Sequence, residues 1–516
     1  MKELHSPEQA ALWLRSQVTG TLKTDSRQVR SGDGFIAWPG AGSDARAYVP
    51  AAILQGASAC IVEKTGVENY QFSKESYSEA LACYPQLKAA SGPIAAAYFE
   101  QPSTQLDVLA VTGTNGKTST AWWLAQALSH LSPARPCGLV GTLGVGRMVK
   151  AGTPLAGIIS TGLTTPDPVL FHHTLRRFVD DGLQACAVEA SSIGLQEHRL
   201  DGTHIRTAVF TNFTQDHLDY HGSMAQYWQA KAVLFEWPDL KAAVVNVDDE
   251  QGSMLAVKLA SSSIDLWTVS MSGPARIQAR DIELGRQGLR FAVCEGDESH
   301  VLETVLIGGF NVSNLLGVIA AMRTLDIALG DAVAACRGLR SVPGRMELVN
   351  GDEGIEAGVE TPIVVVDYAH TPDALAKALQ SLRPFAEQRG GQLWCIFGCG
   401  GDRDVLKRPL MGAVAAKEAD RVVVTSDNPR HEKIQVIISQ ILLGLEGDVK
   451  VNVQADRAQA IAQTMAAANA NDVVLIAGKG HEEEQDVAGV RHPFSDRLHA
   501  QLALQRRVDS QPGARP

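Results

Sequence analysis

The chain lacks the features that place a protein in a membrane or on nucleic acid. No apolar run approaches the ~20 residues that a membrane-spanning helix needs, and Met1–His5 does not open an apolar signal core. Lysine and arginine form no block, and the net charge is −11, which argues against nucleic acid or an anionic membrane as a partner. We therefore expect a cytoplasmic protein without membrane insertion, with a monomer as the working expectation.

Cysteine is present, but no motif pairs it. None of the eight cysteines stands in a C-x-x-C pair, so the sequence suggests neither a zinc site nor a disulfide framework. We expect reduced thiols at Cys60, Cys83, Cys137, Cys186, Cys294, Cys336, Cys395 and Cys399.

The strict phosphate-binding motif G-x-x-x-x-G-K-[ST] is missing by one residue, because Val111 stands where its first glycine should be. The chain has T-G-T-N-G-K-T at 112–118 instead, between an apolar run and an amphipathic segment, which predicts strand, loop and helix. Backbone N–H groups and the helix dipole at such a junction face a bound anion. Lys117 would neutralise the β- and γ-phosphates of a nucleotide, and Thr118 would hold magnesium. The alternative is a glycine turn before an ordinary helix.

At 516 residues the chain exceeds what one hydrophobic core can organise, so about three domains are expected. Residues 1–105 are predicted to form an α/β module. Residues 106–346 alternate strand-like and helical stretches, which predicts a mostly parallel sheet wrapped by helices. Residues 347–516 repeat this alternation and resemble a dinucleotide fold, although no G-x-G-x-x-G opens them. The polar tail after Arg507 is expected to be disordered.

Polar residues follow the predicted strands at their carboxyl ends, where α/β sheets place functional groups. In the central domain the apolar runs are at 108–111, 185–189, 208–211 and 242–246, and Glu189, Asn212 and Asn246 end or follow the last three. In the C-terminal domain, apolar runs at 363–366, 393–397, 422–425 and 473–477 lead into polar or glycine-rich loops at 367–370, 398–403, 426–430 and 478–482.

Several of these residues have both a functional and a structural interpretation. Glu189 is a candidate magnesium ligand because that ion prefers oxygen donors. Taken alone, His217 is more often a satisfied core or surface histidine, and Lys231 a solvated helix residue. Arg345 lies either at a domain hinge or in a surface turn, and Asp367 either holds a ribose or caps the next helix.

Arginines near the predicted strand ends suit an acidic ligand. Arg403 and Arg430 both lie in such loops, and the guanidinium fork pairs bidentately with carboxylates. Near the N-terminus, Asp25, Ser26 and Arg27 form either a ligand contact or a capped turn, and the turn is favoured.

Together these motifs resemble the Mur ligases over nearly the whole chain. Ten strings stand in the order typical of that family: T-G-T-N-G-K-T (112–118), E-x-S-S-x-G-L (189–195), D-H-L-D-Y-H-G (216–222), A-K (230–231), F-N-V-S-N (310–314), V-P-G-R-M-E (342–347), D-Y-A-H-T-P-D (367–373), G-C-G-G-D-R-D (398–404), D-N-P-R (427–430) and G-K-G-H-E (478–482). The resemblance implies an N-terminal UDP-binding domain, a central ATPase domain and a C-terminal amino-acid-binding domain.

The resemblance also implies an ATP-dependent amide ligation in peptidoglycan precursor synthesis. The γ-phosphoryl group of ATP would pass to the free carboxylate of UDP-MurNAc-L-Ala-D-Glu, and the amine of meso-diaminopimelate would displace phosphate from the acyl phosphate. Lys117 and magnesium would neutralise the transferred charge, while the carboxylate needs positioning more than a base. In this family the D-N-P-R loop accompanies meso-diaminopimelate.

Each ligand acquires a set of residues from the resemblance. Catalysis would fall to Lys117, Glu189, His217 and Lys231, and magnesium to Thr118, Glu189, His217 and Lys231 as its carbamate. The ATP site would comprise Gly113, Thr114, Asn115, Gly116, Lys117, Thr118, Ser119, Asn311, Arg345 and Asp367. The UDP-MurNAc-dipeptide would contact Ser26, Thr164, Thr165, Ser191, Glu197 and Arg199. The diaminopimelate would contact Arg403, Asp427, Asn428, Arg430, Gly478 and Glu482.

Two departures from the family pattern and two alternatives remain. Ile193 stands where the family usually has histidine, and Glu197 near a usual glutamine. A folylpolyglutamate synthetase would share the phosphate loop and the carbamate, but the D-N-P-R loop and the N-terminal unit argue against it. A regulatory protein that hydrolyses ATP without ligating anything is disfavoured by the retained catalytic set.

Overall fold

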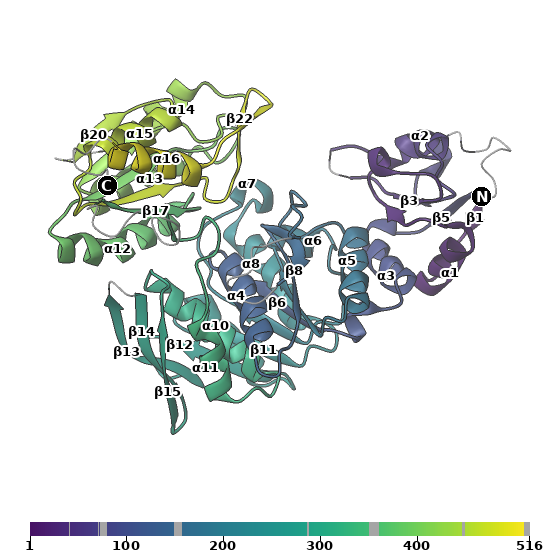
Figure 1. Cartoon of the computed structure of the whole chain (residues 1–516). Coiled ribbons are helices and arrows are strands. Elements are labelled where there is room, and N and C mark those ends of the chain that lie inside the picture. Colours follow the sequence, from purple (N-terminus) through teal and green to yellow (C-terminus); the bar gives the residue numbers. More distant parts are fainter. Residues whose placement is uncertain are drawn as a thin grey trace.

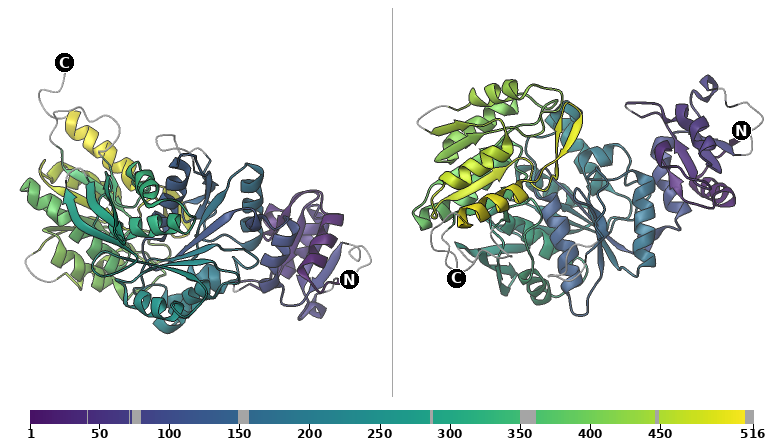
Figure 2. Two further views of the ribbon diagram at one scale, coloured as in Figure 1. Left: turned by 90° about the horizontal axis from the view of Figure 1, so that it is seen from below. Right: turned by 45° about the horizontal axis from the view of Figure 1, so that its top comes forward.

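The computed structural model describes residues 1–40, 42–70, 72, 80–148, 157–285, 288–349, 361–445 and 449–509. Three α/β domains, each built on its own sheet, follow one another along the chain, which confirms the predicted fold class (Figure 1). The central domain lies between the other two in both further views (Figure 2). The predicted boundaries at 105/106 and 346/347 stay a prediction.

The N-terminal domain has a parallel sheet of five strands in the order β1-β5-β4-β3-β2. Its strands are β1 (Lys2–Glu3), β2 (Leu22–Lys23), β3 (Gly34–Ala37), β4 (Ala59–Glu63) and β5 (Leu81–Tyr84). Its helices are α1 (Pro7–Gln17), α2 (Val49–Leu54) and α3 (Leu87–Tyr98), with 3₁₀ turns at Ser26–Gln28, Ala45–Tyr48 and Val67–Asn69. Helix α1 starts at a proline behind the Ser6 cap, whose side chain accepts from Gln9 N.

The central domain has a ten-stranded sheet in the order β15-β14-β13-β12-β11-β10-β6-β9-β7-β8. The strands from β13 to β7 in this order pair in parallel, and the pairs at both edges are antiparallel. Its middle strands are β6 (Asp107–Thr112), β9 (Ala185–Glu189), β10 (Thr207–Phe210) and β11 (Ala242–Asn246). These are the apolar runs that the sequence predicted, because strands buried on both faces are apolar throughout.

The remaining elements complete this domain. The outer strands are β7 (Cys137–Gly141), β8 (Gly144–Arg147), β12 (Asp265–Ser270), β13 (Ile277–Gly285), β14 (Gly288–Glu295) and β15 (Glu298–Thr304). The helices are α4 (Lys117–His130), α5 (Pro168–Asp180), α6 (Ser192–Gln196), α7 (Leu218–His221), α8 (Met224–Ala232), α9 (Glu250–Leu259), α10 (Phe310–Arg323) and α11 (Leu329–Arg337), with 3₁₀ turns at Pro102–Thr104 and Val233–Glu236.

The C-terminal sheet has six strands in the order β16-β17-β21-β18-β19-β20, parallel except for β16. The strands are β16 (Glu347–Leu348), β17 (Ile363–Asp367), β18 (Leu393–Phe397), β19 (Arg421–Val424), β20 (Lys450–Val453) and β21 (Val473–Ala477), with a hairpin of β22 (Glu484–Val487) and β23 (Val490–Pro493). The helices are α12 (Pro372–Arg389), α13 (Lys407–Glu418), α14 (Ile434–Leu442), α15 (Arg457–Ala467) and α16 (Asp496–Asp509).

The expected disordered tail needs one correction. Helix α16 continues to Asp509, so the two residues directly after Arg507 are helical, and the rest of the tail, 510–516, lies outside the described residues. Apolar clusters fill both faces of the central and C-terminal sheets. All eight cysteines are free and buried. Within the described part of the chain, no helix is both long and apolar enough to cross a bilayer.

Candidate functional site

The phosphate loop joins β6 to α4, as predicted. Gly113 and Gly116 have φ of +143° and +84°, and a Cβ at Gly113 would lie 2.0 Å from Thr211 Oγ1, so only glycine fits there. The glycine missing from the strict motif falls within the strand: Val111 is fully buried in β6, between β9 and β10. The loop therefore begins later than in the strict motif.

Lys117 opens α4 and turns back over the loop. Its Nζ donates to Gly113 O and Thr114 O, each at 2.9 Å. Burial lowers the pKa of this amine, although the Glu189 carboxylate acts in the opposite direction. The head group thus lies within the cradle, where an anionic phosphate would replace the two carbonyls as its partner.

Glu189 ends β9 and lies against the loop with 1% of its surface exposed. Its carboxylate accepts from Thr118 Oγ1 at 2.8 Å, and from Thr142 N and Oγ1 at 2.8 and 3.2 Å. Arg345 Nη2 also donates to Thr118 Oγ1, at 3.2 Å. The structure therefore brings together two of the predicted magnesium ligands. Thr142 directly follows β7 and was not predicted, because it lies outside all of the recognised strings.

Lys231 lies in α8 and is 1% exposed, so it is not the solvated helix residue of the structural interpretation. Its Nζ donates to Gly113 O at 2.6 Å and lies 4.4 Å from the centre of the Tyr227 ring. Burial, and then the charge of Lys117, lower the pKa of this amine well below its ordinary value. A neutral primary amine is the form that adds carbon dioxide to give a carbamate.

His217 stands just before α7, with φ of +52°. Its Nε2 lies 3.5 Å from Asp216 Oδ2, and burial lowers the pKa of the imidazole to about 4. The ring is therefore neutral near pH 7 and can offer a lone pair to a metal. Among the described residues, no group of three or more His, Cys, Asp or Glu side chains is placed to hold a metal ion; of these residue types, the predicted set includes Glu189 and His217.

Further residues of the predicted ATP site surround the loop. Asn311 Nδ2 donates to Ile307 O at 2.7 Å, and its Oδ1 accepts from Asn314 Nδ2 at 2.9 Å. Asn314 in turn touches the loop, because a Cβ at Gly116 would lie 2.3 Å from its Oδ1. Asn314 is the last residue of the F-N-V-S-N string, and no role was predicted for it from the sequence.

The loop side chains have contacts of their own. Thr114 Oγ1 donates to Thr214 O at 3.0 Å, and Asn115 Nδ2 donates to Asp373 Oδ2 of the C-terminal domain at 3.1 Å. Ser119 is buried in the first turn of α4.

Arg345 and Asp367 lie between the central and C-terminal domains. The Arg345 guanidinium stacks 4.5 Å from the centre of the Tyr368 ring, and its Nε is buried without a hydrogen-bond partner in the described structure. Asp367 accepts from Met346 N at 2.7 Å, and burial raises the pKa of its carboxyl. Thr371, not Asp367, caps α12, which removes the capping alternative.

Predicted residues of the muramoyl side lie next to Glu189. Thr165 Oγ1 donates to Glu189 O at 2.7 Å and lies 3.0 Å from Ser191 Oγ, while Arg199 Nη1 donates to Thr165 O at 2.9 Å. Thr164 Oγ1 accepts from Thr142 Oγ1 at 3.1 Å. These residues form one continuous polar wall with the phosphate loop.

Glu197 joins two domains. Its carboxylate lies 2.7 Å from Lys88 Nζ of the N-terminal domain and accepts from Tyr220 OH at 2.7 Å. Its predicted contact with the sugar nucleotide stays a prediction.

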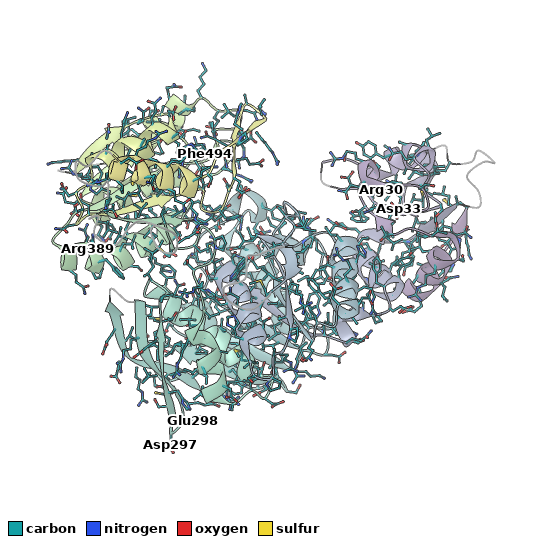
Figure 3. All side chains as sticks on the ribbon, viewed as in Figure 1. Arg30, Asp33, Asp297, Glu298, Arg389 and Phe494 are labelled. Atoms are coloured by element: carbon teal, nitrogen blue, oxygen red, sulfur yellow. The ribbon has the colours of Figure 1, made fainter. Side chains whose placement is uncertain are left out.

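Ser26 lies in the N-terminal domain, in the turn that Asp25 caps through Arg27 N at 3.0 Å. The capped-turn interpretation therefore holds for Asp25 and Arg27. Beside this turn is an open cavity of about 650 Å³, which contains a concentration of basic groups. Its lining is Gly20, Thr21, Lys23, Arg27, Gln28, Val29, Arg30 and Asp33. Arg30 and Asp33 are labelled in Figure 3.

The third group of predicted residues meets at the carboxyl edge of the C-terminal sheet. Asn428 Nδ2 donates to Glu482 Oε2 at 2.8 Å, and a Cβ at Gly478 would lie 2.4 Å from Asp427 Oδ2. Lys479, fully buried, donates to Asn428 Oδ1 at 3.0 Å and lies 2.7 Å from Glu482 Oε2. Sequence reasoning missed Lys479, although it stands in the G-K-G-H-E string.

The two predicted arginines flank Gly400. A Cβ there would lie 2.9 Å from Arg430 Nη1 and 3.8 Å from Arg403 Cγ. Arg430 Nη1 donates to Gly401 O at 2.8 Å, and Arg403 lies 3.8 Å from Asp219 of α7 in the central domain. Both arginine side chains therefore pass beside Gly400, next to the Asn428 backbone, while the Arg403 guanidinium faces Asp219.

The fold and this site define an ATP-dependent ligase that forms amide bonds. The chain belongs to the Mur ligase family, because it matches the Mur ligase middle domain over residues 111–322 and the "Mur ligase, glutamate ligase domain" over residues 344–480. It is 58% identical, over 97% of each chain, to the UDP-N-acetylmuramoyl-L-alanyl-D-glutamate--2,6-diaminopimelate ligase of Acidovorax sp. (strain JS42).

Solved structures agree. A structure titled with the same enzyme name is 33% identical with a TM-score of 0.64, covering 94% of this chain and 95% of that one. The MurF ligase of Thermotoga maritima in complex with ADP has a TM-score of 0.63 at 16% identity, covering 96% and 99%, and shows the fold alone.

Proposed function

We propose that this protein joins meso-diaminopimelate to UDP-N-acetylmuramoyl-L-alanyl-D-glutamate with consumption of ATP, in peptidoglycan precursor synthesis. Membership in the Mur ligase family supports the ligase chemistry, and the two substrates are those named for the similar enzymes. The observation that carries the choice of amino acid is the cluster of Arg403 and Arg430 beside the Asn428–Glu482 pair. One end of diaminopimelate carries a carboxylate and an ammonium, which a guanidinium and a carboxylate complement.

The chemistry follows from the order of the polar groups. The D-glutamyl carboxylate attacks the γ-phosphorus of ATP, ADP leaves, and an acyl phosphate forms. The amine of diaminopimelate then attacks the acyl carbon, phosphate leaves, and the ammonium proton is lost to solvent. Lys117 faces the transferred group, while the wall of Thr165, Ser191 and Arg199 beside Glu189 would orient the dipeptide.

A magnesium ion fits the residues present. Thr118 and Glu189 supply hard oxygen donors that already touch, at 2.8 Å, and His217 is neutral. Thr118, Glu189, His217 and the carbamate of Lys231 would hold the metal, which when bound would neutralise charge on the phosphates. We propose the carbamate because the Lys231 amine is buried beside the phosphate loop, 2.6 Å from Gly113 O, and this burial lowers its pKa and favours the neutral form.

We also propose contacts to the nucleotide and to the uridine. Asn311, Arg345 and Asp367 would contact the nucleotide, and Ser26 the uridine end of the second substrate. Of the two alternatives, a folylpolyglutamate synthetase is disfavoured by the D-N-P-R loop at 427–430. A regulatory protein that does not ligate is disfavoured by the membership of the chain in a ligase family.

Amino-acid selectivity tests this proposal. The enzyme should prefer meso-diaminopimelate over L-lysine by roughly 10⁴-fold, because lysine leaves the guanidinium groups without a partner. Arg430→Ala should raise KM for diaminopimelate sharply and leave KM for ATP and the UDP-dipeptide near wild type. Arg491→Ala, which removes an exposed arginine of the same domain, is the control. Equal use of lysine, or a loss of ATP affinity in Arg430→Ala, would refute the assignment.

A further inference from the structure

The two loops of the proposed amino-acid site come from strands that are not neighbours. Residues 427–430 follow β19 and residues 478–482 follow β21, while β18 lies between these strands in the sheet. The loops nevertheless touch, through Asn428 and Glu482. Some feature must draw them together across the end of β18.

Gly398 makes the close approach possible. It follows β18 directly, and a Cβ at this position would lie 2.4 Å from Thr425 O and 2.8 Å from the carbonyl carbon of Ser426. A side chain here would push the loop after β19 away from the loop after β21.

Arg457 ties the two loops from beneath. It is 1% exposed at the start of α15 and was singled out by no sequence motif. Its Nη1 donates to Ser426 O at 3.1 Å and its Nη2 to Ala477 O at 2.9 Å. These carbonyls directly precede Asp427 and Gly478, so one rigid guanidinium fixes the spacing of both loops.

Asp496 holds the guanidinium in place. It is fully buried at the start of α16 and accepts from Arg457 Nε and Nη2, each at 2.7 Å. A cation at a helix N-terminus is unfavourable by itself, and Asp496 compensates this charge. Helices α15 and α16 lie side by side on one face of the sheet (Figure 1). Phe494, two residues before Asp496, packs against their apolar cluster (Figure 3).

We propose that Arg457, held by Asp496, is a positioning residue that sets the amino-acid selectivity of this ligase. It touches no substrate. It acts through the backbone of the two loops, so that Asn428, Arg430 and Glu482 present their side chains at the separation that the distal end of diaminopimelate requires. This inference rests on the proposed function.

A positioning role and a purely structural role predict different kinetics. Misplaced loops should weaken the amino-acid site alone, because the phosphate loop belongs to another sheet. A general loss of stability should instead affect the amount of active enzyme, and hence kcat, with KM values preserved.

The decisive variant is the double replacement Arg457→Met/Asp496→Leu in the full-length protein. Removing both charges together leaves no unpaired ion, and apolar pairs of similar volume are often tolerated in such places. KM for meso-diaminopimelate should rise by about 10-fold or more and the preference over L-lysine should fall, since small misplacements are costly in an oriented site. KM for ATP and for the UDP-dipeptide should stay within about 2-fold of wild type.

Two further variants keep the test open to refutation. Arg457→Lys retains the charge, but one ammonium cannot replace all four hydrogen bonds of the guanidinium. This variant should therefore show the same pattern of KM changes, with a smaller rise. If the double variant does not fold, Arg457→Lys decides the question. Arg383→Met breaks a 2.6 Å ion pair with Asp420 at the opposite edge of the same sheet, and should leave KM for diaminopimelate unchanged.

A folded double variant with unchanged KM and unchanged preference would overturn the proposal, as would an equal rise of all three KM values. A wild-type enzyme that does not use diaminopimelate would instead refute the proposed function.

Discussion

Two buried lysines, one in each half of the site, have opposite surroundings. Lys231 in the central domain is 1% exposed, donates to Gly113 O and faces the Tyr227 ring. Lys479 in the C-terminal domain is fully buried and lies between Asn428 Oδ1 and the Glu482 carboxylate. Their burial is the same, but only Lys479 has an anionic partner within hydrogen-bond distance.

The difference shows that the partner, not burial alone, decides what a buried amine does. Removing an ammonium from water costs several kcal/mol, which a hydrogen-bonded carboxylate can offset. Without one, burial favours the neutral form, and the pKa of Lys231 is lowered well below its usual value. A neutral amine is a nucleophile suited to modification, whereas a paired ammonium is a fixed bridge between side chains.

The largest expected effect is at Lys231. If the residue acts as a carbamate ligand, Lys231→Ala should lower kcat by at least ~10³-fold. Acetate or formate should restore part of the activity, because a small carboxylate can occupy the space left behind. Lys231→Arg, which keeps a cation and cannot be carbamoylated, is the control and should not be rescued. Full activity of Lys231→Ala without additive would disprove the carbamate.

Lys117 provides the next test, because its proposed partner is the substrate itself. Lys117→Ala should lower kcat/KM by at least ~10²-fold through the loss of charge on the transferred phosphoryl group. The thermal unfolding midpoint should change little, since the hydrogen bonds described for Lys117 Nζ go to two carbonyls of the loop itself. A variant with more than about a tenth of the wild-type rate would contradict the phosphate-cradle assignment.

Lys479 should show a smaller and more selective effect. Lys479→Met removes the bridge between Asn428 and Glu482, so KM for meso-diaminopimelate should rise by about 10-fold while KM for ATP is retained. Lys479→Arg should retain part of the affinity because it keeps the cation. If Lys479→Met instead lost ATP affinity, the two lysines would not serve separate halves of the site.

The same rule extends to a histidine away from the site. His172 is fully buried, its Nε2 lies 3.0 Å from Asp201 O, and burial lowers the pKa of the imidazole to about 4. Its stabilising contribution is complete above the unfolded pKa of ~6.5 and is lost as pH falls toward 4. Between pH 8 and pH 5, wild type should lose about 2 kcal/mol more of its unfolding free energy than His172→Gln.

Urea unfolding at the two pH values measures this difference. Parallel pH dependence in the two proteins would mean that folding does not lower the pKa of His172.

The sequence predicted the parallel centres of the larger sheets well. Ala185–Glu189, Ala242–Asn246, Leu393–Phe397 and Val473–Ala477 have the predicted bounds, because strands covered on both faces are continuous apolar runs. The antiparallel extension β13–β15 was not predicted, since one of its faces is polar and its apolar runs are interrupted.

The candidate site was predictable where a local string specifies it. The phosphate loop and the loops after β9, β19 and β21 were recognised. The structure places the first two of these against each other through Thr118 and Glu189, and the last two through Asn428 and Glu482. Thr142 and Arg457 were not assigned roles because their contacts are made between segments distant in the sequence, and for Lys479 this holds for the contact with Asn428. Nor does the sequence of α8 reveal that the phosphate loop covers Lys231.

Because every cysteine is buried, the reaction of a cysteine thiol with a reagent reports local unfolding of the protein around it. Burial raises the pKa of the Cys60, Cys137, Cys336 and Cys399 thiols to about 12, so that a disulfide reagent finds almost no thiolate in the folded state. Each sheet region contains at least two cysteines, with Cys60 and Cys83 in the first, four in the second and Cys395 and Cys399 in the third. The rate at which each thiol is labelled would therefore measure how often its own domain unfolds, with and without ATP bound, in a protein to which no probe has been attached.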